Sequence, residues 1–289
     1  MTVTVLHEIS ARRRRTDKVM RGALLAGTGI ALVPLALVVY YLLYKGLSSW
    51  NSNFFTTDPN GSFFGNHGGI RSAIVGTLEI VGLATIMAVP AGIGVALYLT
   101  EYGKASRFAN VVRYFVDVMT GVPSIVFGLF IYISLVISHV GGGFTAWKGS
   151  LAVSLLMLPI VIRSSEVVLL LVPNSLREAA LALGAPRWRV VTRVVLPTSL
   201  SGLITGSLLA VARGMGETAP LLFTVSSAFV LTGNLGAQMN TLPVQIFTDI
   251  KSPEPAITAR AWGAGLTLVA LVLILNLIAR AISRRSRVA

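Results

Sequence analysis

The sequence has 289 residues, of which 54% are hydrophobic and only 12% are charged. A soluble domain carries about 25% charged residues, so this composition argues against a water-soluble domain and against a disordered chain, and favours a protein that lies mostly in lipid. The net charge of +13 fits either a nucleic-acid-binding protein or the cytoplasmic bias of Lys and Arg in membrane proteins. The absence of cysteine excludes a disulfide framework, a zinc–thiolate site and a thiol nucleophile.

Six apolar stretches are long enough to cross a bilayer, which takes about 20 residues. They are 22–44, 72–100, 114–138, 149–172, 194–232 and 262–279, the last extending outward to about Thr258. The fifth stretch is too long for one helix, and Gly214, Gly216 and Pro220 predict a break in it. We therefore expect an all-α integral membrane fold with six transmembrane helices, the fifth ending near Gly216 and followed by a short re-entrant or interfacial piece.

The basic residues predict the orientation of these helices. Of the 24 Lys and Arg residues, 17 lie in the N-terminal tail, at the C-terminal end, and in the loops after the second and fourth stretches. Because basic residues concentrate on the cytoplasmic side, both termini are expected there, and the net charge needs no nucleic-acid partner. The chain then divides into a cytoplasmic basic tail (1–21), a first transmembrane helix (22–44) and a main membrane domain (70–282).

The cytoplasmic loop 173–193 has the pattern of two short helices. Ser175 and Glu178 have the spacing of a capping box, Gly184 can end the first helix in a left-handed conformation, and Pro186 suits the start of the next. An ordinary capped helix on the membrane surface explains this pattern. A second interpretation is a docking helix that another protein approaches closely, because three alanines keep it thin: Ala179, Ala180 and Ala182.

Two arginines lie inside the apolar stretches, where a charge is costly without a partner or a watery path. Arg163 can pair with Glu166 three residues on, and Arg213 with Glu217 four residues on. Alternatively, two guanidinium groups that face one cavity would bind an oxyanion, because each presents a planar fork of donors. Both interpretations stay open and can coexist, with Arg163 nearer the cytoplasm and Arg213 nearer the outside.

The loop also carries a longer pattern: Glu178-Ala179-Ala180, then Gly184, then, after nine residues, Val194 and Leu196-Pro197. It resembles the cytoplasmic signature of binding-protein-dependent ABC importer permeases, E-A-A-x3-G-x9-I-x-L-P, with valine replacing the isoleucine. The resemblance implies the type I ABC importer permease fold over 70–282. It also implies a coupling helix that docks on an ATP-hydrolysing subunit through Glu178, Ala179, Ala180 and Gly184.

Two further segments, 121–128 and 212–220, resemble the phosphate-specific branch of that family, the PstA-type permeases. This resemblance covers about residues 71–280 and implies a subunit of an ATP-driven phosphate importer in a bacterial or archaeal inner (plasma) membrane. The implied partners are a second, PstC-like permease, a PstB-like ATP-binding dimer and an extracytoplasmic, PstS-like phosphate-binding protein. Arg163, Arg213, Glu217 and Glu166 would then line the substrate pathway.

Phosphate differs from sulfate in carrying a proton at neutral pH, which a pathway carboxylate can accept while it repels the fully ionised sulfate. Glu217 is the first candidate for this acceptor and Glu166 the second. A permease for sulfate or molybdate is the alternative within the family, because the arginines favour an oxyanion without identifying it.

The sequence contains no G-x-x-x-x-G-K-[S/T] motif, so we expect the chain to bind no cofactor itself and a partner ATPase to use ATP and magnesium. The three histidines (His7, His67 and His139) lie in the tail or in loops, which argues against an intramembrane enzyme. An ATPase-independent secondary transporter is the remaining alternative, although it would not need the E-A-A loop.

Overall fold

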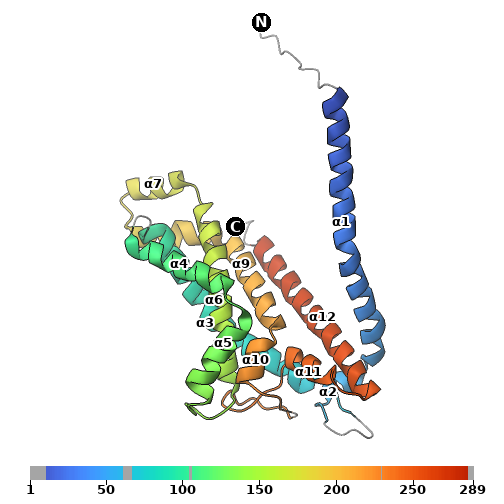
Figure 1. The fold of residues 1–289 in the computed structure, drawn as a ribbon. Helices are drawn as coiled ribbons and strands as arrows, with labels where there is room; N and C mark the ends of the chain where they lie inside the picture. The colour runs from blue at the N-terminus through green and yellow to red at the C-terminus, as the bar shows by residue number, and fades with distance from the viewer. Residues whose placement is uncertain (1–10, 61–66, 104–105, 229, 286–289) are drawn as a thin grey trace.

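A computed structural model describes residues 11–60, 67–103, 106–228 and 230–285, and these residues are mostly helical (Figure 1). Within the bilayer a helix satisfies every backbone hydrogen bond internally, which explains why the apolar stretches all become helices. The expected all-α membrane fold is therefore confirmed. Residues 1–10 of the predicted basic tail lie outside the described part of the chain.

Among the described residues, five helical segments are long and apolar enough to span a membrane, and a bent pair makes up to six. Three of the segments are single helices: α1 (Ala11–Gly46), α6 (Ala146–Leu170) and α12 (Pro255–Arg285). Another is α3 (Arg71–Leu97), which continues through the π-helical turn η2 (Tyr98–Tyr102). The remaining one is α9 (Leu196–Gly216), which is preceded by α8 (Arg187–Val190) and η4 (Val191–Val195).

The predicted span 114–138 is present only as a bent pair of helices, because Pro123, which predicts a kink, interrupts it. The chain forms α4 (Arg107–Gly121), then α5 (Ser124–Ile131) and η3 (Tyr132–Val136), and the two halves are bent by 102°. Pro123 has no backbone N–H, and the residue before a proline avoids the helical conformation. Val122 is accordingly extended, with φ −74° and ψ 129°.

The predicted break in the fifth stretch is confirmed. The helix α9 ends at Gly216, and the six-residue helix α10 (Ala219–Thr224) follows directly. After an irregular segment, α11 (Leu242–Asp249) leads into the last spanning helix. Two short helices, η1 (Leu47–Ser49) and α2 (Ser52–Thr56), connect the first spanning helix to the second.

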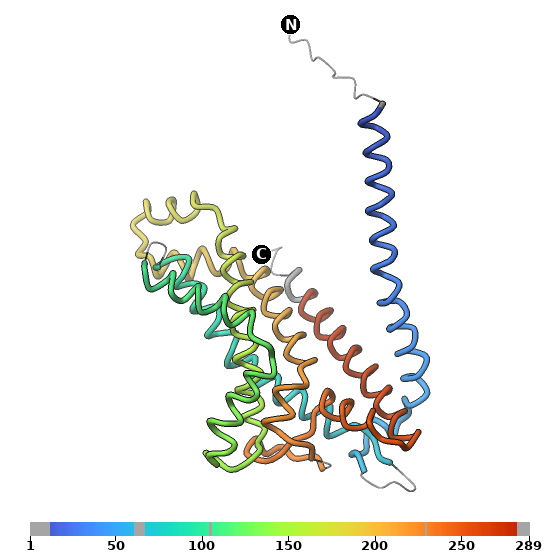
Figure 2. The backbone as a smooth tube through the Cα atoms, viewed as in Figure 1, coloured from blue at the N-terminus to red at the C-terminus, as the bar shows by residue number. Residues whose placement is uncertain are grey.

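The spanning helices form a bundle from which α1 stands apart (Figures 1 and 2). Near its C-terminal end α1 contacts α12, where the rings of Tyr41 and Trp262 pack edge to face 5.0 Å apart. The helix α7 (Asn174–Ala182) lies across one end of the bundle, and α1 begins and α12 ends on that same side. We call this side the elbow end, and the side that carries segments 137–145 and 225–241 the loop end.

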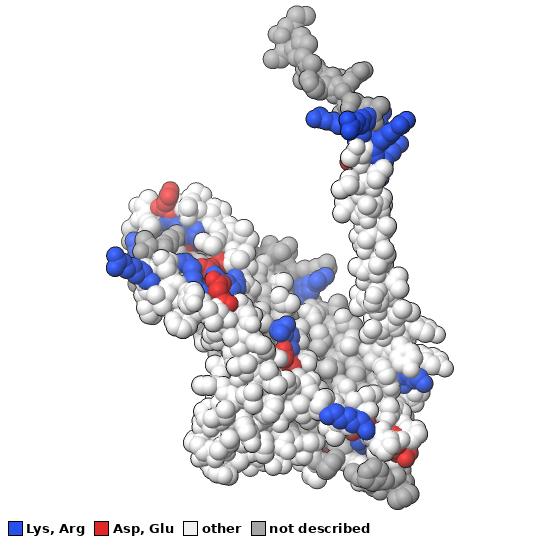
Figure 3. Space-filling view, in the orientation of Figure 1, with Lys and Arg blue, Asp and Glu red and all other residues white. Residues whose placement is uncertain are grey.

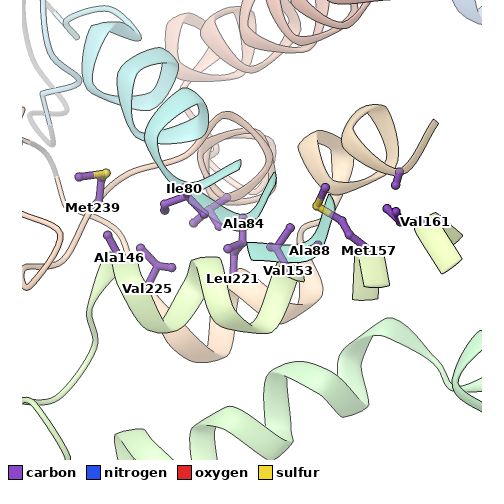
Figure 4. Close-up of a cluster of buried hydrophobic side chains, with 12 residues drawn as sticks. Ile80, Ala84, Ala88, Ala146, Val153, Met157, Val161, Leu221, Val225 and Met239 are labelled. Carbon is purple, nitrogen blue, oxygen red and sulfur yellow. The ribbon is translucent and has the colours of Figure 1, made fainter. Parts of the chain in front are cut away.

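Helices α3, α6 and α10 meet in the main hydrophobic core (Figure 4). Small residues allow the helices to approach closely. The G-x-x-x-G spacing of Gly202 and Gly206 in α9 predicts close packing, and both glycines lie against α6. A Cβ atom on Gly202 would lie 2.6 Å from Val168 Cγ1, and one on Gly206 would lie 2.7 Å from Ser164 Oγ.

Candidate substrate pathway and coupling elbow

Arg163 belongs to a cluster of four charged side chains from α4 and α6. Its Nη1 donates to Glu166 Oε2 at 2.7 Å, its Nη2 pairs with Asp117, and the same nitrogen donates to the carbonyl of Arg113 at 3.3 Å. The Nε of Arg113 donates to the other oxygen of Glu166 at 2.7 Å. The carboxylate of Glu166 is buried at the centre, with 8% of its side chain exposed.

This cluster confirms the predicted pairing of Arg163 with Glu166. The four-residue spacing of Arg113 and Asp117 predicts an ion pair within α4, and this prediction is wrong: Asp117 pairs with Arg163, and Arg113 with Glu166. The bend between α4 and α5 explains the difference, because it allows the polar face of α4 to pack against α6. The two terminal nitrogens of Arg163 thus already donate to three protein acceptors.

Arg213 and Glu217 form the second predicted pair, and their contact is looser. Arg213 Nη2 lies 3.4 Å from Glu217 Oε1, and 58% of the Arg213 side chain is exposed. Glu217 is the residue just beyond α9, in an extended conformation with φ −76° and ψ 124°. Its side chain is 12% exposed. Figure 3 shows one small blue and red patch near mid-height of an otherwise mostly white face.

Close contacts between α6 and α9 give the relative depth of the two pairs. Gly206 lies against Ser164, and Gly214 lies against Met157, where a Cβ atom would come 2.9 Å from the sulfur. Arg213 is therefore level with Met157, and Arg163 lies six residues further toward the elbow end, roughly 9 Å at 1.5 Å per residue. Arg163 thus lies closer to the elbow end than Arg213 does, and the two arginines share no carboxylate among the described residues.

The two segments that carry the phosphate-branch resemblance, 121–128 and 212–220, touch each other in the fold. A Cβ atom on Gly128 of α5 would lie 2.6 Å from Pro220 Cα of α10, so only a glycine permits this approach. The contact places α5 next to the break at which Glu217 lies. Sequence reasoning identified both segments but not their contact, because nothing in the local pattern of either segment encodes the other.

A further ionisable residue, Glu79, lies within α3. Its Oε2 atom is buried and has no hydrogen-bond partner among the described residues. A carboxylate within a span can bond to neighbouring hydroxyl groups or face a pathway, and among the described residues Oε2 bonds to no hydroxyl group.

The loop 173–193 forms the predicted pair of short helices, α7 and α8, which we call the coupling elbow. Gly184 follows α7 with φ +79°, the left-handed conformation that was expected. The predicted capping box was wrong: α7 begins at Asn174, one residue before Ser175, and no side chain caps it. Glu178, Ala179 and Gly184 are exposed, and Ala180 is half-buried.

These features define a polytopic α-helical permease with a surface elbow, the architecture of type I ABC importers. Solved structures support the class. The fold is similar to a bacterial alginate ABC transporter in complex with an alginate pentasaccharide-bound periplasmic protein, with a TM-score of 0.64, 17% identity and coverage of 94% of this chain and 96% of that one. It is also similar to the inward-facing MetNI methionine ABC transporter, with a TM-score of 0.56, 20% identity and coverage of 75% and 94%.

Residues 88–288 match the binding-protein-dependent transport system inner membrane component family. The chain is 39% identical to the phosphate transport system permease protein PstA of Haemophilus influenzae, over 93% of this chain and 94% of that protein. It is 41% identical to the protein of that name from Mycobacterium leprae, over 94% and 90%. The chain belongs to this family and, within it, to the PstA permeases. It is a multi-pass inner-membrane transport component rather than an enzyme, and family membership implies an ATPase and a binding protein as partners.

Proposed function

We propose that this chain is a transmembrane permease subunit of an ATP-driven phosphate importer and forms the translocation pathway with a second permease. The observation that carries the proposal is the Arg213–Glu217 pair, an ion pair within the membrane whose arginine is largely exposed. A charge in a membrane span is costly unless it has partners or lines a watery path. The loose contact to Glu217 leaves most of the donors of Arg213 open to an anion.

The two side chains have complementary parts in this function. The guanidinium fork of Arg213 matches the geometry of a phosphate group and donates charge-assisted hydrogen bonds to it. Glu217 is close enough to Arg213 to accept the O–H of the same phosphate, which a sulfate ion lacks. Arg163 and Glu166 have protein partners in this conformation, so their entry into the pathway would require the cluster with α4 to open.

The proposed arrangement places the elbow end in the cytoplasm, with both termini, and the loop end outside. The gathering of Lys and Arg at the elbow end supports this orientation (Figure 3). The exposed side chains of Glu178 and Ala179, with Ala180 and Gly184, would contact a PstB-like ATPase that uses ATP and magnesium. A PstC-like permease and a PstS-like phosphate-binding protein would complete the importer.

The test is uptake by the reconstituted importer. The chain would be co-expressed with its second permease and ATPase, placed in proteoliposomes, and supplied with phosphate-loaded binding protein and ATP on the ATPase side. We expect uptake of labelled phosphate that requires ATP and resists competition by sulfate and molybdate. Equal competition by sulfate or molybdate would assign a different oxyanion, and uptake without a functional ATPase would show a secondary transporter.

A further inference from the structure

The helix of the coupling elbow that carries Glu178, Ala179 and Ala180 has one buried residue, and that residue is charged. Arg177 is 8% exposed, whereas its neighbours on both sides are exposed and Ala180 is half-buried. A cavity of about 500 Å³ lies beside α7, and its lining includes Arg177 and Glu101 together with Glu178 and Leu181. Besides Ala180, which packs against a buried apolar cluster of the bundle, Arg177 is the residue of α7 that reaches into the bundle.

Every N–H donor of Arg177 has an acceptor, and the acceptors come from different helices. Its Nη2 donates to Glu101 Oε1 at 2.8 Å, and its Nε donates to the same carboxylate at 3.1 Å. Its remaining donors reach the backbone carbonyls of Leu169 (2.9 Å) and Val172 and the side chain of Asn174. A guanidinium group has five N–H donors, so this one is fully used.

These acceptors connect segments that the chain does not join directly. Leu169 lies in the last turn of α6 and Val172 lies just beyond the helix, at the end where the helix dipole favours a cation. Glu101 lies in the π-helical turn η2, which continues α3. Along the chain α7 directly follows α6 and precedes α8, whereas α3 is not its neighbour. Arg177 thus joins α7 to α3 and, a second time, to α6.

Without the contacts of Arg177, only a short non-helical segment of the chain would connect α6 to α7. Pro173 precedes α7 in an extended conformation with ψ 138°, so rotation there could turn α7 without moving the bundle. The ion pair prevents this rotation. Both of its side chains are 10% exposed, so breaking it would leave a charge buried without its partner.

We propose that Arg177 is a positioning residue for energy coupling, which binds Glu101 and the end of α6 at once and so makes α7, α3 and α6 move as one body when the ATPase displaces α7. This inference rests on the proposed function, because it requires an ATPase on the elbow. It assigns Arg177 no contact with ATP or with the transported anion.

The first experiment measures the rigidity of the elbow and needs no transport. The chain has no cysteine, so Leu183→Cys, where the side chain is 88% exposed, and Phe108→Cys, where it is 63% exposed, give one pair of spin labels between the elbow and α4. In the assembled importer without nucleotide, we expect a narrow distance distribution. Arg177→Gln should broaden it, and an unchanged width would overturn the proposal.

The second experiment measures the number of phosphate ions transported per ATP hydrolysed. We expect Arg177→Gln and Glu101→Gln each to lower this ratio by roughly tenfold, within the range typical of coupling between two sites. Arg177→Lys keeps the charge but reaches fewer acceptors, so it should give an intermediate ratio, and it replaces the glutamine variant if that variant does not assemble. Arg107→Gln, which removes an exposed arginine of α4, is the matched control and should transport like the wild type.

The outcomes separate the two proposals. A wild-type importer without ATP-dependent phosphate uptake contradicts the proposed function, whatever the spin labels show. If the wild-type importer transports phosphate and the Arg177→Gln and Glu101→Gln variants keep the wild-type ratio of phosphate transported to ATP hydrolysed, only the role of Arg177 is overturned.

Discussion

The two arginines within the spanning helices have contrasting surroundings. Arg163 donates to two carboxylates and a backbone carbonyl, and its side chain is 31% exposed. Arg213 has one carboxylate at 3.4 Å, and its side chain is 58% exposed. Both occur in the same pattern, an arginine followed by a glutamate three or four residues later. The contrast shows that this pattern alone does not separate an arginine that holds helices together from one that is available to a substrate.

The physical difference lies in the number of acceptors that each guanidinium group has within the protein. A saturated guanidinium group offers an anion little, because binding the anion requires protein hydrogen bonds to break first. A guanidinium group with unused N–H donors in a mostly apolar environment gains new hydrogen bonds when an anion binds. We therefore expect changes near Arg163 to affect stability first and changes near Arg213 to affect transport first.

The largest expected effect is on stability, from Glu166→Ala. Glu166 accepts hydrogen bonds from both Arg113 and Arg163, so its loss leaves two partly buried cations facing each other. Removing one partner of a buried ion pair typically costs about 3 kcal/mol or more. Thermal unfolding of the purified complex, followed by tryptophan fluorescence, should show a lower midpoint. A normal midpoint with lost uptake would instead make Glu166 a pathway residue.

Arg213→Ala should have the opposite profile. Charge-assisted hydrogen bonds contribute up to about 3 kcal/mol, so phosphate uptake should fall by roughly a hundredfold. The midpoint of unfolding and the yield of assembled complex should stay at the wild-type values, because Arg213 makes a single long contact. Arg213→Lys, which keeps the charge but loses the planar fork, should retain part of the uptake. Near-normal uptake by the alanine variant would remove Arg213 from the mechanism.

Much of this contrast could not be predicted from the sequence. Local spacing correctly predicted the pairs Arg163–Glu166 and Arg213–Glu217, the end of α9 at Gly216 and the left-handed Gly184. The partners Arg113 and Asp117 belong to another helix, and they reach α6 where α4 packs against it. The four-residue spacing within α4 paired Asp117 with Arg113, because spacing along one helix cannot show that both side chains reach α6.

The coupling elbow gives a second example. The family signature identified the helix that carries Glu178, but the residue that fixes this helix is Arg177, which pairs with a glutamate 76 positions away. The capping box failed for a local reason. The helix begins at Asn174, directly after Pro173, so Ser175 lies inside the first turn instead of before it. Pairings between distant segments depend on packing, which no single segment encodes.

A smaller effect is expected on the selectivity for phosphate over sulfate. Glu217→Gln removes the negative charge beside Arg213 and keeps a side chain of the same size. The carboxylate no longer repels a fully ionised anion, so we expect sulfate to compete better with phosphate for uptake, by roughly tenfold. The glutamine should leave the midpoint of unfolding close to normal. Unchanged discrimination would mean that Glu217 only orients Arg213.

The smallest effect concerns an ion pair outside the bilayer, which serves as a solvent-facing reference for the two intramembrane pairs. Arg71 Nη2 lies 2.8 Å from Asp58 Oδ2, with 45% and 19% of the two side chains exposed. Hydrogen bonds from Arg71 hold the pKa of Asp58 below its usual value of 3.8, although burial opposes this shift. A lowered pKa means that the pair stabilises the folded state above about pH 4 and loses this effect as the pH falls through the lowered pKa.

The variant Asp58→Asn tests how much the Asp58–Arg71 ion pair contributes to stability. At pH 7 the variant should unfold at most a few degrees below the wild type, because exposed ion pairs contribute little. At a pH below the lowered pKa of Asp58 the two proteins should unfold at the same temperature, since the wild-type carboxyl is then neutral as well. A difference that persists at low pH would show that the substitution disturbs a contact that does not depend on the charge of Asp58, such as the hydrogen bond that the backbone N–H of Leu231 donates to Oδ2 at 3.3 Å.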